Sequence, residues 1–84
     1  MISSQVALYP LANNDFKQVI SQALDRIIPL KEQGLVIEVG SMSTILRGSD
    51  ELVWNAIQLL FKEASKDGQQ IVLNVQISNE CGCE

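Results

Sequence analysis

Apolar and polar residues alternate one by one along three parts of the chain, which is the pattern of a strand with one buried face. Residues 2–9 place Ile2, Ser4, Val6 and Leu8 on the inner side. Residues 70–78 place Ile71, Leu73, Val75 and Ile77 there, and residues 35–39 alternate in the same way. We therefore expect strands over these three ranges.

Two other stretches repeat their apolar residues every three or four positions, which predicts amphipathic helices. The first begins behind an Asn cap and carries Phe16, Val19, Ile20, Ala23, Leu24, Ile27 and Ile28. Pro29 should kink or end this helix, and Gly34 marks its exit. The second helix follows Ser49 as its cap and ends at Asp67-Gly68. Its core stripe is Val53, Ala56, Ile57, Leu60 and Ala64.

The dipeptide Gly40-Ser41 predicts a two-residue hairpin between the 35–39 strand and a third strand that follows it. In that register, Val39 faces Met42 and Glu38 faces Ser43. The inner face then carries Leu35, Ile37, Val39, Met42, Thr44 and Leu46, and the outer face Val36, Glu38, Ser43, Ile45 and Arg47. The pair of Glu38 and Ser43 fits a ligand contact and a plain cross-strand hydrogen bond equally well.

The order strand, helix, strand, strand, helix, strand predicts a single α+β domain over residues 1–84. Right-handed crossovers and the hairpin favour a ferredoxin-like βαββαβ sandwich, in which two helices cover one face of a four-stranded antiparallel sheet. In the expected strand order 4-1-3-2, the first strand lies between the third and the fourth. The uncovered face mixes Gln5, Tyr9, Glu38, Ser43, Asn74 and Gln76 with Ala7, Val36, Ile45 and Val72. Such a face is typical of a wet subunit interface or a pocket wall.

The charge balance argues against several classes of partner. Ten acidic and six basic residues give a net charge of −4 without a basic patch, so we expect neither nucleic acid nor a membrane surface as a partner. No signal peptide is visible and no apolar run is long enough to span a bilayer. We therefore expect a cytoplasmic protein with Cys81 and Cys83 reduced.

Catalytic groups are scarce in this sequence, which contains no histidine. That removes the usual general base and the commonest metal ligand. No glycine-rich phosphate loop and no pair of carboxylates is visible, so we expect no enzyme activity and no cofactor. Cys81-Gly82-Cys83 could bind a soft metal or form a redox pair, but two thiolates make an incomplete site, and unliganded thiols are the favoured interpretation.

Self-association is expected from the size of the chain. A domain of 84 residues buries only about 60–65% of its unfolded surface, so its own core is marginal. The second helix carries a surplus of apolar residues beside its core stripe, namely Leu52, Trp54, Leu59 and Phe61. For Trp54 and Phe61, packing against a subunit or the sheet edge is favoured over stacking on a flat ligand. We expect a homo-oligomer.

Three stretches carry a resemblance to a known family. They are Gln5-Val6-Ala7-Leu8-Tyr9-Pro10-Leu11, Val39-Gly40-Ser41-Met42-Ser43-Thr44 and Ile77-Ser78-Asn79. Their order and spacing resemble the YkoF-type family of thiamine-binding proteins, and the Gly-x-Met-Ser-Thr segment is the distinctive part. The resemblance implies a ferredoxin-like fold, subunits paired through their sheets as dimers or tetramers, and binding of thiamine or its hydroxymethylpyrimidine half.

The resemblance also implies a binding site. Met42, Ser43, Thr44, Ser78 and Asn79 match the family's motifs. Ser43, Thr44 and Asn79 could pair the amine and ring nitrogens of an aminopyrimidine, and Glu38 or Tyr9 could offset the positive thiazolium. The leading hypothesis is a non-catalytic binder of this ligand. The alternatives are an oligomeric scaffold of the same fold without a ligand and, third, a small enzyme acting on the pyrimidine.

Overall fold

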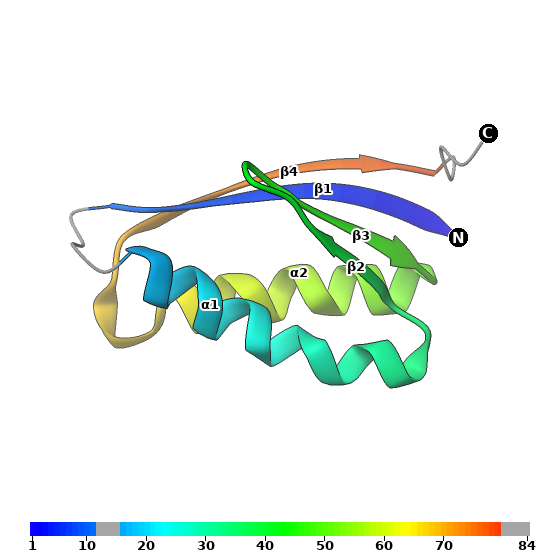
Figure 1. Cartoon of the computed structure of the whole chain (residues 1–84), viewed down its shortest axis with the longest axis horizontal. Coiled ribbons are helices and arrows are strands. Elements are labelled where there is room, and N and C mark those ends of the chain that lie inside the picture. Colours follow the sequence, from blue (N-terminus) through cyan, green and yellow to red (C-terminus); the bar gives the residue numbers. More distant parts are fainter. Residues whose placement is uncertain (12–15, 80–84) are drawn as a thin grey trace.

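Strands and helices follow one another in the order that the hydrophobic pattern predicts. The computed structural model describes residues 1–11 and 16–79. Their elements are β1 (Ile2–Pro10), α1 (Phe16–Ile27), the 3-10 helix η1 (Ile28–Gln33), β2 (Val36–Val39), β3 (Thr44–Gly48), α2 (Asp50–Ala64), the 3-10 turn η2 (Lys66–Gly68) and β4 (Ile71–Ser78) (Figure 1). The expected Asn cap of the first helix and the two cysteines lie outside the described residues.

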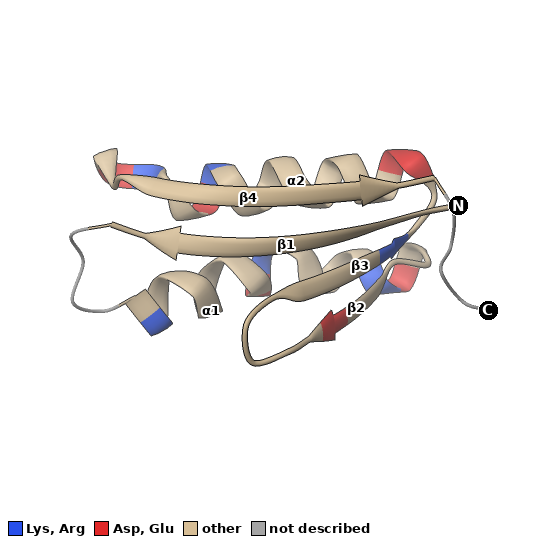
Figure 2. Ribbon diagram, turned by 90° about the horizontal axis from the view of Figure 1, so that it is seen from above, with Lys and Arg blue, Asp and Glu red and all other residues tan. Residues whose placement is uncertain are grey.

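One antiparallel sheet holds all four strands in the order β2-β3-β1-β4. Both helices lie against the same face, and Figure 2 shows the sheet in front of them with its other face uncovered by the described chain. The predicted ferredoxin-like fold and strand order are therefore confirmed. None of the helices in the described part of the chain combines the length and hydrophobicity needed to cross a bilayer.

The core lies between this sheet and the two helices, and it is built by the predicted stripes. α2 buries all five residues of its stripe, Val53, Ala56, Ile57, Leu60 and Ala64. α1 buries Val19, Ala23 and Ile27, while Phe16 and Ile28 at the ends of its stripe stay about half exposed. The strands add mainly Ile2, Val6 and Leu46.

The helix ends follow the expected local chemistry. Ser49 caps α2, since its hydroxyl accepts a hydrogen bond from the Leu52 N–H at 3.3 Å. α1 ends at Ile27, and Pro29 lies in the first turn of the 3-10 helix that follows. That helix ends at Gly34, whose φ of 107° is a backbone conformation that side chains disfavour.

The register of the β2–β3 hairpin differs from the expectation. Val39 pairs with Thr44 and Glu38 with Ile45, so residues 40–43 form a four-residue connection rather than a two-residue turn. The Gly40 N–H donates to the Ser43 carbonyl at 2.8 Å and closes this loop. A shift by two residues keeps every strand position on its expected face. Met42, expected on the inner face, instead lies in the loop and is 87% exposed.

The physical reason for the longer loop is the packing of the core. The observed register pairs Ile37 with Leu46, which is fully buried between the sheet and the helices. The two-residue turn would pair Ile37 with Thr44 instead. Glu38 and Ser43, expected as a facing pair, are consequently separated.

The two faces of β3 should differ sharply in their contribution to stability. We expect Leu46→Ala to lower the free energy of unfolding by about 2–5 kcal/mol, because it leaves a cavity in the core. Ile45→Ala, on the half-buried outer face, should cost about 1 kcal/mol. Urea denaturation of both variants measures this. Equal losses would contradict the assignment of faces.

Candidate binding site

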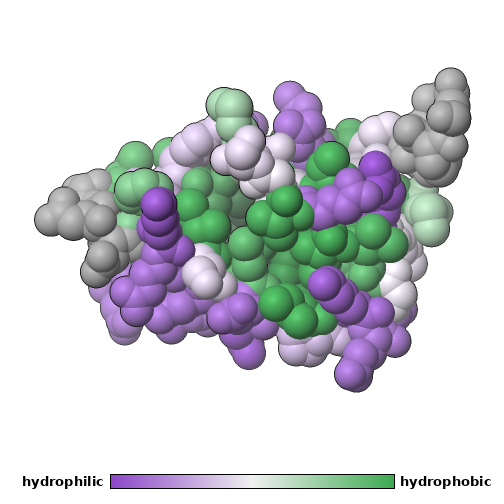
Figure 3. Space-filling model, in the orientation of Figure 1, coloured by the Kyte–Doolittle hydropathy of each residue, from purple (hydrophilic) through white to green (hydrophobic). Residues whose placement is uncertain are grey.

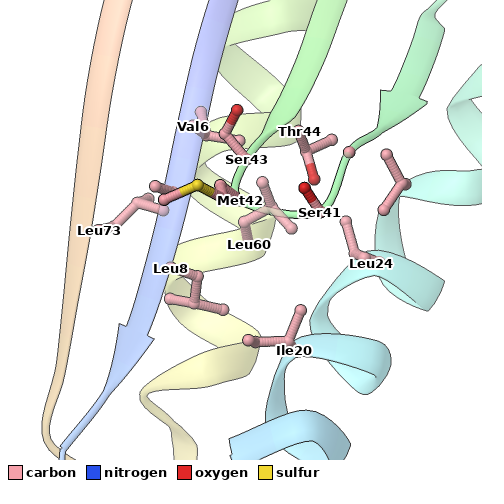
Figure 4. Close-up of a pocket in the computed structure, with 13 residues that line it drawn as sticks. Val6, Leu8, Ile20, Leu24, Ser41, Met42, Ser43, Thr44, Leu60 and Leu73 are labelled. Atoms are coloured by element: carbon pink, nitrogen blue, oxygen red, sulfur yellow. The ribbon is translucent and has the colours of Figure 1, made fainter.

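A pocket of about 120 Å³ lies beneath the β2–β3 loop, and we call it the loop-end pocket (Figure 4). Its rim is the connection between the two strands together with the first residue of β3: Gly40, Ser41, Met42, Ser43 and Thr44. Its floor comes from β1, the two helices and β4, with Val6, Leu8, Ile20, Leu24, Leu60 and Leu73 among the lining residues. Five parts of the chain, namely β1, α1, the β2–β3 connection, α2 and β4, therefore meet at this point.

The rim of the pocket is held in shape by a short backbone contact. The Gly40 N–H bonds the Ser43 carbonyl oxygen, and a β-carbon on Gly40 would lie only 3.0 Å from that same oxygen. This distance is at the edge of steric overlap. Glycine at position 40 therefore lets the loop fold back tightly over the pocket.

The hydroxyl groups of the rim are not all directed alike. Figure 4 shows the hydroxyl oxygens of Ser41 and Thr44 turned toward each other beside the loop, and that of Ser43 turned in the opposite direction from that of Thr44. The Ser43 hydroxyl accepts a hydrogen bond of 3.1 Å from Gln5 Nε2, on the uncovered face of the sheet. Thr44 and Ser41 are thus better placed to meet a ligand in the pocket than Ser43.

None of the 13 residues that line the loop-end pocket carries a charge. Burying a charged group in such a place without a partner is costly, whereas a neutral polar ring needs only hydrogen-bond partners. The pocket therefore suits an uncharged, flat group with a few donors and acceptors.

Two wider hollows adjoin the pocket. One, of about 390 Å³, is lined by Tyr9 and Phe16, and the other, of about 500 Å³, runs between α1 and β2 past Asp25. Ile20 and Ser41 line both hollows and the loop-end pocket as well. Figure 3 shows apolar side chains gathered over this side of the molecule, with a hollow below the hairpin. A ligand larger than one ring has room to extend from the pocket.

The structure separates the expected site residues into two groups. Met42, Ser43 and Thr44 line the pocket, and Tyr9 lines the hollow beside it. Thr44 pairs with Val6, and Ser78 pairs with Ser3.

Ser43 directly precedes Thr44 in the chain, and Asn79 directly follows Ser78. Measured along β1, the positions of Ser43 and Asn79 are therefore five residues apart, about 17 Å. Ser78 lines a different hollow, of about 320 Å³, on the uncovered face beside Arg47. Ser78 and Asn79 therefore do not share the loop-end pocket of their own chain.

Glu38 also lies outside the pocket. It stands on the uncovered face of β2, opposite Ile45, and its carboxylate accepts a hydrogen bond of 2.8 Å from Arg47 Nη1. The expected contact of Glu38 with Ser43 is wrong, because the hairpin register places them on different rungs. The negative charge of Glu38 is already paired.

Ser41 and the apolar floor are pocket residues that the sequence does not predict. In the sequence, Ser41 is a turn residue at the variable position of the Gly-x-Met-Ser-Thr segment. The residues of the floor have the sequence pattern of ordinary core positions in their own helices and strands. No local sequence signal shows that a gap remains between these elements. In the described ranges, no three histidine, cysteine, aspartate or glutamate residues are grouped to hold a metal ion, and Cys81 and Cys83 lie beyond those ranges.

Comparison with known proteins gives a consistent result. A model of the YKOF-related family matches residues 1–84. A Streptococcus pneumoniae protein of known structure is 22% identical, with a TM-score of 0.78 over 92% of this chain and 83% of that one. No curated protein matches the chain.

Two further solved structures share the fold. A Thermotoga maritima protein provisionally assigned to thiamine biosynthesis or salvage is 20% identical, with a TM-score of 0.75 over 94% of this chain and 83% of that one. A domain of unknown function from Bacillus cereus is 18% identical, with a TM-score of 0.77 over 96% of this chain and 77% of that one. At such identities the likeness shows the fold alone.

The tight loop over the pocket can be tested directly. We expect Gly40→Ala to lower the free energy of unfolding by about 1 kcal/mol and to shift the backbone amide signals of residues 40–44, because the new β-carbon presses on the Ser43 oxygen. Ser41→Ala, in the same loop but without a new close contact, should leave the free energy of unfolding unchanged. An unchanged free energy of unfolding for Gly40→Ala as well would contradict the loop geometry.

Proposed function

The chain belongs to the YKOF-related family, and on that premise we propose that it binds thiamine or the hydroxymethylpyrimidine half of thiamine without catalysing a reaction on it. The observation that carries the proposal is the loop-end pocket, which is uncharged, about the size of one ring, and edged by the Gly-x-Met-Ser-Thr segment. The provisional assignment of the Thermotoga maritima relative supports the same ligand class.

The size and polarity of the pocket match a pyrimidine ring. Its volume of about 120 Å³ is close to the roughly 150 Å³ of a protein cavity known to hold benzene. The apolar floor can pack against the faces of the ring, while the hydroxyls of Ser41 and Thr44 can pair the amine and a ring nitrogen. Each polar group left unpaired in such a site would cost about 1–3 kcal/mol.

The positively charged thiazolium half would lie outside the pocket. The hollow lined by Tyr9 and Met42 adjoins the pocket, since Ile20 and Ser41 line both. The half-exposed ring of Tyr9 offers a cation a favourable face. Glu38 is a weaker candidate for this role because Arg47 already holds its carboxylate. The net charge of −4 favours the approach of a cation at long range.

Ser78 and Asn79 would reach this ligand only from another chain, given their distance along β1 from the loop. We therefore place them at a second contact surface that exists in a homo-oligomer, a dimer or a tetramer. If the oligomer forms but no ligand binds, the protein is the ligand-free scaffold instead.

Calorimetry tests the ligand and the pocket together. We expect wild-type protein to bind hydroxymethylpyrimidine with a dissociation constant near micromolar, about −8 kcal/mol. Thr44→Val should weaken this by about 1–2 kcal/mol, five- to thirty-fold, because it removes a hydroxyl from the pocket at nearly constant shape. Ser43→Ala should weaken it less, since that hydroxyl is turned toward Gln5.

Two results would oppose the proposal. Flat heats up to millimolar thiamine and hydroxymethylpyrimidine would favour the scaffold. Equal affinity of wild type and Thr44→Val for the ligand, at equal melting temperature, would indicate that the ligand binds outside the loop-end pocket.

Asn79→Ala tests whether a second chain completes the site. We expect it to weaken binding by about 1–2 kcal/mol at protein concentrations where the oligomer forms, and to have no effect on the monomer. Titrations at two protein concentrations, one on each side of the association midpoint, measure this. An equal loss at both concentrations would mean that Asn79 acts within its own chain.

A further inference from the structure

A second hollow, of about 320 Å³, lies on the uncovered face of the sheet and shares no lining residue with the loop-end pocket. Residues that pair directly across neighbouring strands point to the same face of a sheet, so its side chains on this face form two rows across β3, β1 and β4. The rows are Arg47, Ser3 and Ser78, and then Ile45, Gln5 and Gln76. We call this place the arginine hollow.

The dimensions of the arginine hollow follow from the sheet. Neighbouring strands lie about 4.8 Å apart, and residues two apart on one strand about 7 Å apart. The two rows therefore cover about 10 by 7 Å. Serine fills two positions of the first row, and its short side chain leaves room between the longer Arg47 and Gln76. That space suits a small organic molecule of a few carbon atoms.

Arg47 gives this hollow its charge. It is the only basic residue on the four strands, and Glu38 is the only acidic one. Figure 2 shows them as the blue segment of β3 and the red segment of β2. All other residues that line the hollow are uncharged, and several of them carry hydroxyl or amide groups. A guanidinium surrounded by neutral hydrogen-bonding groups is suited to bind a small anion.

The hydrogen bonds of Arg47 are incomplete. A guanidinium carries five N–H donors in one plane. Nη1 donates to Glu38 at 2.8 Å, whereas the buried Nε–H has no acceptor among the described residues. An anion bound beside the guanidinium would supply that acceptor. The side chain is 28% exposed, so its outer end can turn to bring the Nε–H to a ligand.

We propose that the arginine hollow binds the carboxylate of a small hydroxylated organic acid. Nε and Nη2 of Arg47 form a parallel pair of donors that matches the two oxygens of a carboxylate, and Glu38 takes neither of them. Gln5 uses one N–H for Ser43, and its amide oxygen can accept a hydrogen bond from a hydroxyl of the acid. The amide of Gln76 borders the same hollow. This site is independent of thiamine binding.

Glu38 favours a carboxylate over a phosphate as the bound group. Its carboxylate pairs with Arg47, so the two side chains together carry no net charge. A phosphate with two negative charges would be repelled by Glu38 about twice as strongly as a carboxylate with one. The lining of the hollow contains no second cation that could offset this repulsion.

NMR titration of the labelled protein tests the ligand class. We expect L-lactate, a small hydroxy acid, to shift the Arg47 Nε–H signal and the amide signals of Gln5 and Gln76 in a saturable way. Lactamide, in which a neutral amide replaces the carboxylate, should leave these signals in place. Inorganic phosphate should bind more weakly than lactate.

Matched variants test the role of the charges. Arg47→Gln should lower the affinity for lactate about ten- to a hundredfold, because it removes the charged hydrogen bonds. Glu38→Gln should raise it about threefold, because a like charge beside the ligand is lost. Arg26→Gln is the control, since this other arginine pairs with Glu63 between the helices. Damage to the fold would not produce changes of opposite sign.

Three outcomes would overturn the proposal: identical, unsaturable shifts with lactate and lactamide, equal affinity of wild type and Arg47→Gln for lactate, or tighter binding of phosphate than of lactate. Binding of hydroxymethylpyrimidine is measured separately on the same proteins. Arg47→Gln should bind that ligand as wild type does, so failure of the arginine hollow and failure of the proposed function are distinguishable.

Discussion

The structure depends on the central position of β1, whose side chains alternate between the two faces of the sheet. β1 pairs with β3 on one side and with β4 on the other, burying Ile2 and Val6 against the helices. A shift of the register by one residue would move the buried side chains of β1 to the uncovered face. Burial of β1 therefore fixes the pairing register of both β3 and β4. The hairpin loop is thereby held beside the middle of β1, where Thr44 pairs with Val6, and the end of β4 beside the start of β1, where Ser78 pairs with Ser3. The location of the pocket follows from this arrangement.

The sequence was sufficient to predict the helices, the strands and the strand order, because periodicity and caps are local properties. The buried stripe of α2 and the Ser49 cap are examples, and both agree with the structure. The hairpin register was not accessible in the same way. Loops of two and four residues leave every strand position on the same face, so the hydrophobic pattern cannot distinguish them. The choice is made by the pairing of Ile37 with Leu46 in the core, which is a tertiary contact.

The candidate site was predictable only in part, for a related reason. The resemblance led to Thr44 through a motif that is continuous in sequence, and the structure places Thr44 on the pocket rim. The floor joins β1, both helices and β4, so the pocket is a gap left between elements that each look complete by themselves. The separation of Ser43 from Asn79 is also tertiary, since it depends on where two different strands meet β1. Motif matching alone would have placed them in one site.

The proposed ligand residues lie at two separate places in the fold. The loop-end pocket is edged by the β2–β3 connection, and its floor includes Leu60 of α2 and Leu73 of β4. Ser78 lies at the far end of β4, opposite Ser3, and Asn79 directly follows it. A ligand shifts an association equilibrium only by the difference in its affinity for the free and assembled states. A ligand that touches only the pocket of one chain has no such difference, so it would bind monomer and oligomer alike. Coupling between ligand binding and assembly therefore requires that the end of β4 of another chain contributes to the site.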